Sequence, residues 1–121
     1  MKVSAMFLLA VFLVACSSPD QYTVRNASRE LATMYCEAVL ECDYLHEPLL
    51  PACIEHSSWH LCEIQQSCGE ELNEGVASEL LDQCAKGLAS LDIEGCYFLG
   101  YWGFLPEGCT PAYNMIYEAG L

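Results

Sequence analysis

The sequence predicts an all-α fold, a small disulfide-stapled helical bundle of about three to four helices that follows a cleaved signal peptide. Apolar residues recur every three or four positions along several segments, which is the period of an amphipathic helix. No segment combines β-branched side chains with the apolar–polar alternation of a half-buried strand. The chain also has 9 cysteines in 121 residues, so disulfides are expected to reinforce a modest core.

The N-terminal segment predicts export. Met1 and Lys2 precede an apolar run over residues 3–14 that only Ser4 interrupts. This run is shorter than the about 20 residues that a transmembrane helix needs, and its length is typical of a secretory signal peptide. The run ends in the motif LVAC at Cys16, which resembles the lipobox of bacterial lipoproteins.

This resemblance, which covers residues 1 to about 18, implies a lipid anchor in the cell envelope. It implies that residues 1–15 are a lipoprotein signal peptide, that Cys16 carries a diacylglycerol thioether, and that the new amine is acylated, for example with palmitate. Several acyl chains hold a protein stably on a membrane. Asp after the lipidated cysteine often marks inner-membrane retention in Gram-negative lipoproteins, so Ser17 favours the outer membrane for a Gram-negative source.

The number of cysteines supports the lipid assignment. An odd number in an exported chain leaves one cysteine without a disulfide partner, and assigning Cys16 to lipid leaves an even set. Their pairing cannot be derived from the sequence. The alternative is an ordinary signal peptide with an incidental Cys16, and a secreted inhibitor or toxin-like protein is the function that would require release from membranes. The cysteines expected to form disulfides are Cys36, Cys42, Cys53, Cys62, Cys68, Cys84, Cys96 and Cys109.

The rest of the chain predicts a tether and one domain. Residues 16–25 are polar and are expected to form a lipidated tether, and residues 26–121 form one cysteine-rich helical domain. All 17 acidic residues follow the signal peptide, against Arg25, Arg29 and Lys86. This balance argues against nucleic acid as a partner and against docking on anionic lipid, because both need clustered basic residues. It permits a basic partner or weak divalent cation binding, although solvated acidic faces explain the charge equally well.

Four helices are expected along the domain. The first covers residues 27–43, with Asn26 or Ser28 as its cap. Cys36 and Cys42 are six residues apart in it, about 120° around the helix, so they should have different partners. Its apolar face consists of Leu31, Met34, Tyr35, Ala38, Val39 and Cys42.

Proline, glycine and cap residues delimit the other expected helices. They cover residues 51–67, 73–91 and 111–118. Pro51 suits a first helical turn, Gly69 a helix end, Asn73 a cap, and Thr110 with Pro111 a cap and first position. The segments YCEAVLEC, LLDQCAKGLASLDIEGC and LPEGC loosely resemble uncharacterised cysteine-rich helical lipoproteins of Gram-negative bacteria, a resemblance that implies no activity.

The segment CIEHSSWHLCE is the one local cluster with metal-ligand chemistry. His56 and His60 are four residues apart and share a helix face, and Glu63 follows on nearly the same stripe. Such a set could hold zinc with an open position. Ser57 stands where the HExxH motif has its general base, so that motif is absent. The alternative is a half-exposed helix face whose histidines bind nothing, and no cofactor is predicted.

The segment CYFLGYWGFLPEGC is the best candidate for a binding surface. One interpretation is an exposed aromatic loop that docks a partner, a glycan or the membrane interface. The other, commoner for apolar side chains, is a satellite core beneath a loop closed by Cys96 and Cys109. The aromatic residues concerned are Tyr97, Phe98, Tyr101, Trp102 and Phe104.

No motif predicts an enzyme. GxSxG, phosphate-binding glycine loops and CxxC are all absent from the sequence. The expected role is structural, or an interaction with an envelope or extracellular protein, by a domain held on the membrane through the lipid at Cys16. The alternatives are a small metal- or ligand-binding module that uses His56 and His60, and the secreted inhibitor or toxin-like protein.

Overall fold

The computed structural model describes residues 21–121, and the expectations for the signal peptide, Cys16 and Ser17 lie outside these residues. The all-α fold is confirmed, with five α-helices in this part of the chain instead of three to four. An isolated bridge between Thr23 and Glu71 is its only β-type pairing. The helices are α2 (Val24–Glu41), α3 (Leu50–Ser58), α4 (Glu74–Ala89), α5 (Ile93–Tyr97) and α6 (Thr110–Ala119).

Four shorter helical segments complete the chain. Two are 3₁₀ turns that lead into α3 and α6, and two are π-helical continuations of α3 and α5. The segments are η1 (Glu47–Leu49), η2 (Trp59–Glu63), η3 (Phe98–Trp102) and η4 (Glu107–Cys109). Between residues 21 and 121, no helix has both the length and the apolarity needed to span a bilayer.

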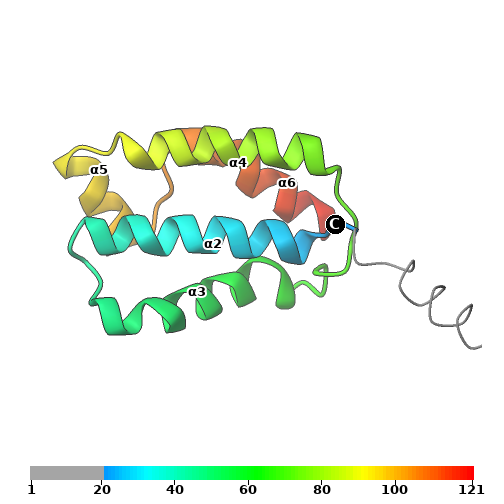
Figure 1. Ribbon diagram of the computed structural model, residues 1–121, viewed down its shortest axis with the longest axis horizontal. Helices are drawn as coiled ribbons and strands as arrows, with labels where there is room; N and C mark the ends of the chain where they lie inside the picture. Colours follow the sequence, from blue (N-terminus) through cyan, green and yellow to red (C-terminus); the bar gives the residue numbers. More distant parts are fainter. Residues whose placement is uncertain (1–20) are drawn as a thin grey trace, which may run out of the picture.

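Helix α2 is the central element of the bundle (Figure 1). It packs against α3 on one side and against α4 and α6 on the other. The described chain starts next to the C-terminus, at one end of α2. Helix α5 lies at the opposite end, beside the last turns of α2 and α4.

Helix α2 begins earlier than the sequence predicts, at Val24. The side-chain oxygen of Asn26 accepts hydrogen bonds from the backbone N–H of Thr23 at 2.8 Å and from its hydroxyl at 3.0 Å. Thr23 is therefore the cap, and the expected caps Asn26 and Ser28 lie inside the helix. Val24 and Arg25, expected in the tether, belong to the folded domain, where their backbone N–H groups bond to carbonyls of residues 68 and 70.

Some of the cap and end residues predicted for the later helices are confirmed, and others are corrected. Asn73 caps α4, since its Oδ1 accepts from the N–H of Val76 at 3.0 Å. Pro51 and Pro111 lie in the first turns of α3 and α6, as expected. Thr110 is not a cap, because it is the first residue of α6 and Cys109 precedes it as the N-cap. The second helix ends with η2 at Glu63, four residues before the expected end at residue 67.

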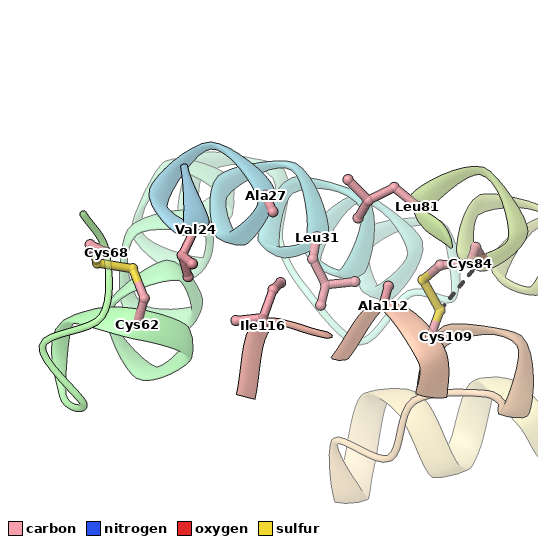
Figure 2. Packing of buried hydrophobic residues seen from close by; sticks show 10 residues of the cluster. All are labelled: Val24, Ala27, Leu31, Cys62, Cys68, Leu81, Cys84, Cys109, Ala112 and Ile116. Atoms are coloured by element: carbon pink, nitrogen blue, oxygen red, sulfur yellow. Dashed lines mark hydrogen bonds between the residues drawn. A yellow bond between two sulfur atoms is a disulfide. The ribbon is translucent and has the colours of Figure 1, made fainter. Parts of the chain in front are cut away.

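The core lies where α2, α4, α6 and the end of η2 meet (Figure 2). Aliphatic side chains from the three helices surround Leu31, and two disulfides are part of the same cluster. The two disulfides lie at opposite ends of the cluster, with Leu31, Ala112 and Ile116 between them. The cluster consists of Val24, Ala27, Leu31, Cys62, Cys68, Leu81, Cys84, Cys109, Ala112 and Ile116.

The eight cysteines of residues 21–121 form four disulfides. As predicted, Cys36 and Cys42 have different partners. The expectation that Cys96 and Cys109 close one loop is wrong, because Cys96 pairs with Cys42, the C-cap of α2, and Cys109 pairs with Cys84 of α4. The bonds are Cys36–Cys53, Cys42–Cys96, Cys62–Cys68 and Cys84–Cys109.

Candidate binding surface

The aromatic segment is helical and does not form the loop that the sequence predicts. Asp92 starts α5, because its Oδ1 accepts a hydrogen bond from the N–H of Gly95 at 2.7 Å. The helix continues through Gly100 as the π-helical segment η3. It ends at Gly103, whose left-handed φ of 74° suits a residue without a Cβ.

Five aromatic side chains of this segment are exposed to solvent. Their exposed fractions run from 40% for Tyr97 to 65% for Tyr101. The interpretation as a satellite core is therefore wrong for the rings, because only Leu99 of α5 and η3 is fully buried. We call the five residues the aromatic surface. They are Tyr97, Phe98, Tyr101, Trp102 and Phe104.

The rings of the aromatic surface contact one another and leave their outer faces free. Tyr97 stacks on Tyr101 with ring centroids 5.3 Å apart, and Trp102 stacks on Phe104 at 6.3 Å. Tyr101 meets Trp102 edge to face at 5.2 Å, which joins the two stacks. A connected set of rings can bind a planar or cationic group at a low entropic cost, because few torsions must be ordered.

Two contacts hold the aromatic surface on the bundle. The Cys42–Cys96 disulfide joins the end of α2 to α5. Gly100 packs directly on the side chain of Tyr44, and a Cβ at this position would overlap with that side chain. The position of the rings is therefore set by covalent and steric constraints, although most of their own area is outside the core.

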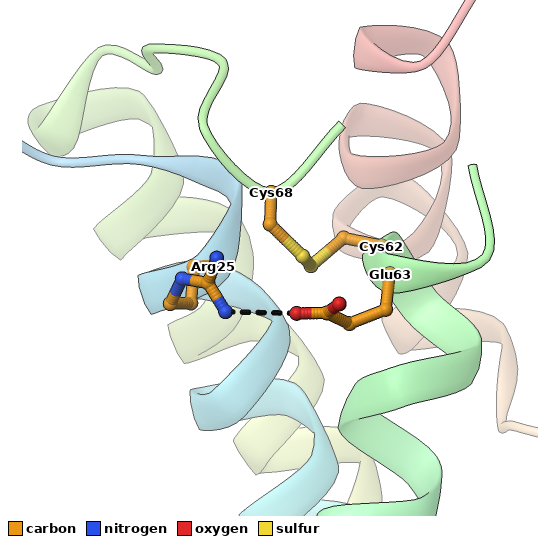
Figure 3. Close-up of polar contacts among 4 residues, drawn as sticks. All are labelled: Arg25, Cys62, Glu63 and Cys68. Atoms are coloured by element: carbon orange, nitrogen blue, oxygen red, sulfur yellow. Dashed lines mark hydrogen bonds and ion pairs between the residues drawn. A yellow bond between two sulfur atoms is a disulfide. The ribbon is translucent and has the colours of Figure 1, made fainter. Parts of the chain in front are cut away.

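Only two of the three predicted metal ligands, His56 and His60, lie together in the structure. The rings of His56 and His60 lie 4.5 Å apart between centroids, as their spacing predicts. Glu63 points to Arg25 instead, with Oε1 3.0 Å from Nη1 (Figure 3). Both neighbouring cysteines, Cys53 and Cys62, are in disulfides. Across residues 21–121, no three His, Cys, Asp or Glu side chains are arranged to hold a metal ion.

An open groove of about 330 Å³ runs along the two histidines and reaches Gly103, between Trp102 and Phe104 in the sequence. Its lining residues come from α2, α3, η2, α6 and the segment after η3, and none of them is acidic or basic apart from the histidines. Phe104 lines an adjoining hollow together with Tyr113. The groove is lined by Leu31, Ala32, Tyr35, His56, Ser57, His60, Leu61, Gly103, Leu105 and Tyr113.

One π-helical segment lines this groove and the other ends beside it. His60 and Leu61 belong to η2, and Gly103 directly follows η3. Such turns are rare and occur frequently at functional sites. The groove residues Tyr35 and Tyr113 are not among the site residues that the sequence predicts. Burial raises the pKa of Tyr35 above its ordinary value, because the phenolate would lose hydration there.

No protein family, curated protein or solved structure matches this chain. The described surface itself is therefore the basis on which a function can be assigned.

Proposed function

We propose that the protein is a membrane-anchored, acidic lipoprotein of the cell envelope that acts by binding another protein through its aromatic surface. The observation that carries this proposal is the exposure of five rings on one short segment, each of which contacts at least two of the others. Tyr, Trp and Phe are enriched in the buried centres of protein interfaces. For a Gram-negative source, the proposed location is the outer membrane.

Two features support the lipid anchor. Residues 1–18 resemble a lipoprotein signal with its lipidated Cys16. The eight cysteines after residue 21 pair among themselves, so a disulfide to Cys16 is not needed to complete any of these pairs. Lipid attachment is the chemistry that accounts for a cysteine at the end of a signal sequence.

An intact mass tests the anchor. The protein is purified from membranes and weighed before and after reduction. The expected mass starts at Cys16 and includes acyl chains, and reduction adds a pair of hydrogens for each of the four disulfides. An unlipidated mass would contradict the anchor and favour the secreted alternative.

Site-specific photo-cross-linking tests the interaction. A photoreactive phenylalanine analogue replaces Tyr101 in the aromatic surface or, as a control, Tyr117 on α6, an exposed tyrosine outside that surface. The expected result is one discrete adduct at Tyr101, absent at Tyr117 and lost when Trp102→Ser is added. Circular dichroism checks that each variant is folded. Adducts that are equal at the two positions, or unchanged by Trp102→Ser, would contradict this function.

A second candidate function uses the histidines. His56 and His60 border the same groove with rings close enough to share one ion, which favours a small metal- or ligand-binding module. Zinc titration by calorimetry is the test, with the double substitution His56→Ala and His60→Ala. His46→Ala is the matched control, because this exposed histidine lies outside the groove. Zinc binding that is unchanged in the double variant would remove this candidate.

A further inference from the structure

The aromatic surface lies far from the end of the domain where the tether enters. Helix α5 is at one end of the bundle, and α2 begins at the other end, close to the C-terminus (Figure 1). Between the two ends lies α2, whose 18 residues correspond to about 27 Å. A partner that reaches this surface therefore meets the end of the domain that is distal to the proposed anchor.

Three carboxylates lie on or beside α5, the helix that leads into the aromatic surface. Glu41 and Asp92 line one hollow at the junction of α2 and α5, next to the disulfide formed by Cys96. Glu94 is three residues before Tyr97 on α5, so the two side chains are neighbours on the helix. All three acidic residues are exposed.

The cations of the described residues do not balance this charge. Arg25 and Arg29 lie in the first two turns of α2, at the tether end, and Arg25 is already paired with Glu63. Lys86, in the last turn of α4, is the only cation of residues 21–121 in the distal half. The distal end thus combines exposed rings with a surplus of negative charge.

This combination discriminates among partners. The faces of aromatic rings attract cations, and neighbouring carboxylates add attraction and pair with them. The same carboxylates repel anionic lipid and nucleic acid. We infer that the aromatic surface binds a basic segment of a partner protein, whose Arg or Lys side chains stack on the rings and pair with Glu41, Asp92 or Glu94. This inference rests on the proposed interaction function and specifies its partner class.

Arginine is expected to bind better than lysine. Its planar guanidinium stacks on aromatic rings and pairs with a carboxylate through two parallel hydrogen bonds, whereas an ammonium group is a compact, strongly hydrated charge. The connected rings Tyr97, Tyr101 and Trp102 offer several adjacent stacking positions.

Tryptophan fluorescence tests the inference with a defined probe. Trp59→Phe leaves Trp102 as the only tryptophan of the chain, so the signal reports on the aromatic surface. The probe is an acetylated and amidated Gly-Arg repeat peptide, compared with Gly-Lys and Gly-Glu repeats. The expected order of affinity is Arg, then Lys, with no saturable change for Glu. The Kd for Gly-Arg should rise roughly tenfold between about 0.05 M and about 0.5 M NaCl.

Two carboxylate variants distinguish the effect of the carboxylates near α5 from the effect of the net charge of the protein on peptide binding. The test variant carries Glu41→Gln, Asp92→Asn and Glu94→Gln, and Asn at position 92 keeps an oxygen that can accept the capping bond to Gly95. Its Kd for Gly-Arg should rise roughly tenfold. The control variant removes the same charge from three exposed residues on other helices and should keep the original Kd. The control substitutions are Glu55→Gln, Glu79→Gln and Glu118→Gln.

The outcomes distinguish this inference from the proposed function. Equal weakening in both carboxylate variants, or a Trp102 response to vesicles of phosphatidylcholine and phosphatidylglycerol, would overturn the basic-partner inference. If the photo-cross-link at Tyr101 then persists and still needs Trp102, the interaction function stands with a partner of another kind. Loss of the specific cross-link contradicts the function itself.

Discussion

The hydroxyl of Ser28 is fully buried in α2 and has no hydrogen-bond partner in the described residues. Ser28→Ala should raise the free energy of unfolding by about 1–2 kcal/mol, because it removes an unpaired polar group and improves helix propensity. Ser78→Ala, at an exposed position of α4, should raise it by only about 0.5 kcal/mol. Urea unfolding measures both, and a larger gain at Ser78 would contradict the argument.

Tyr22 makes the fold sensitive to alkali. Partial burial, together with the charge of Glu30 and its hydrogen bond from the Tyr22 hydroxyl at 3.3 Å, raises the pKa of Tyr22 from 10.0 to about 12. The folded state therefore holds this proton more tightly than the unfolded state, and its contribution to stability is complete below pH 10 and is lost between pH 10 and about 12. Absorbance of phenolate should show late-titrating tyrosines, because the pKa of Tyr35 is raised as well, and the amplitude of the late step should fall in Tyr22→Phe. Glu30→Gln should shift the titration of Tyr22 to lower pH, and an unchanged late step in Tyr22→Phe would contradict the assignment.

At the scale of the element, Gly100 is the residue that lets η3 lie against the bundle. A Cβ there would overlap with Cβ and Cγ of Tyr44, which are too near the backbone to swing aside. Gly100→Ala should therefore lower the free energy of unfolding by about 1–3 kcal/mol through overpacking. Gly69→Ala is the control, because no atom lies within 4 Å of the place that its Cβ would occupy and the cost should be near zero. Thermal unfolding that is equally affected by both substitutions would contradict this packing.

At the scale of the whole molecule, the Cys42–Cys96 disulfide closes the longest loop. Its sequence separation is 54, against 17 for Cys36–Cys53. From the entropy that each bond removes from the unfolded chain, Cys42–Cys96 should contribute about 4 kcal/mol to the free energy of unfolding and Cys36–Cys53 about 3 kcal/mol. Replacing Cys42 and Cys96 by Ala should also detach α5, because this helix packs mainly on η3 and has no other covalent link to α2.

Hydrogen exchange distinguishes the two disulfides. Amides of α5 and η3 should lose protection when Cys42 and Cys96 are replaced, and should keep it when Cys36 and Cys53 are replaced. Protection that is lost equally in both variants would show that the disulfide does not hold the aromatic surface in place.

The sequence by itself determined the features that depend on neighbouring residues. Helix periodicity, the cap at Asn73, and the prolines that open α3 and α6 act over one or two turns, so they could be predicted without tertiary information. The different partners of Cys36 and Cys42 also followed from helix geometry alone. The acidic composition, with the partner classes it disfavours, is likewise a property of the sequence.

Only the tertiary structure decided which residues share a surface. Disulfide pairing requires Cα atoms a few ångströms apart, and that distance depends on how the helices pack. Glu63 lies on the histidine stripe in sequence, yet Arg25, 38 residues away, holds its carboxylate. In the aromatic segment Leu99 is buried and Gly100 packs on Tyr44, whereas the five rings lie on the exposed side. Burial depends on which residues pack against a side chain, and these come from distant parts of the chain, so the local sequence cannot predict it.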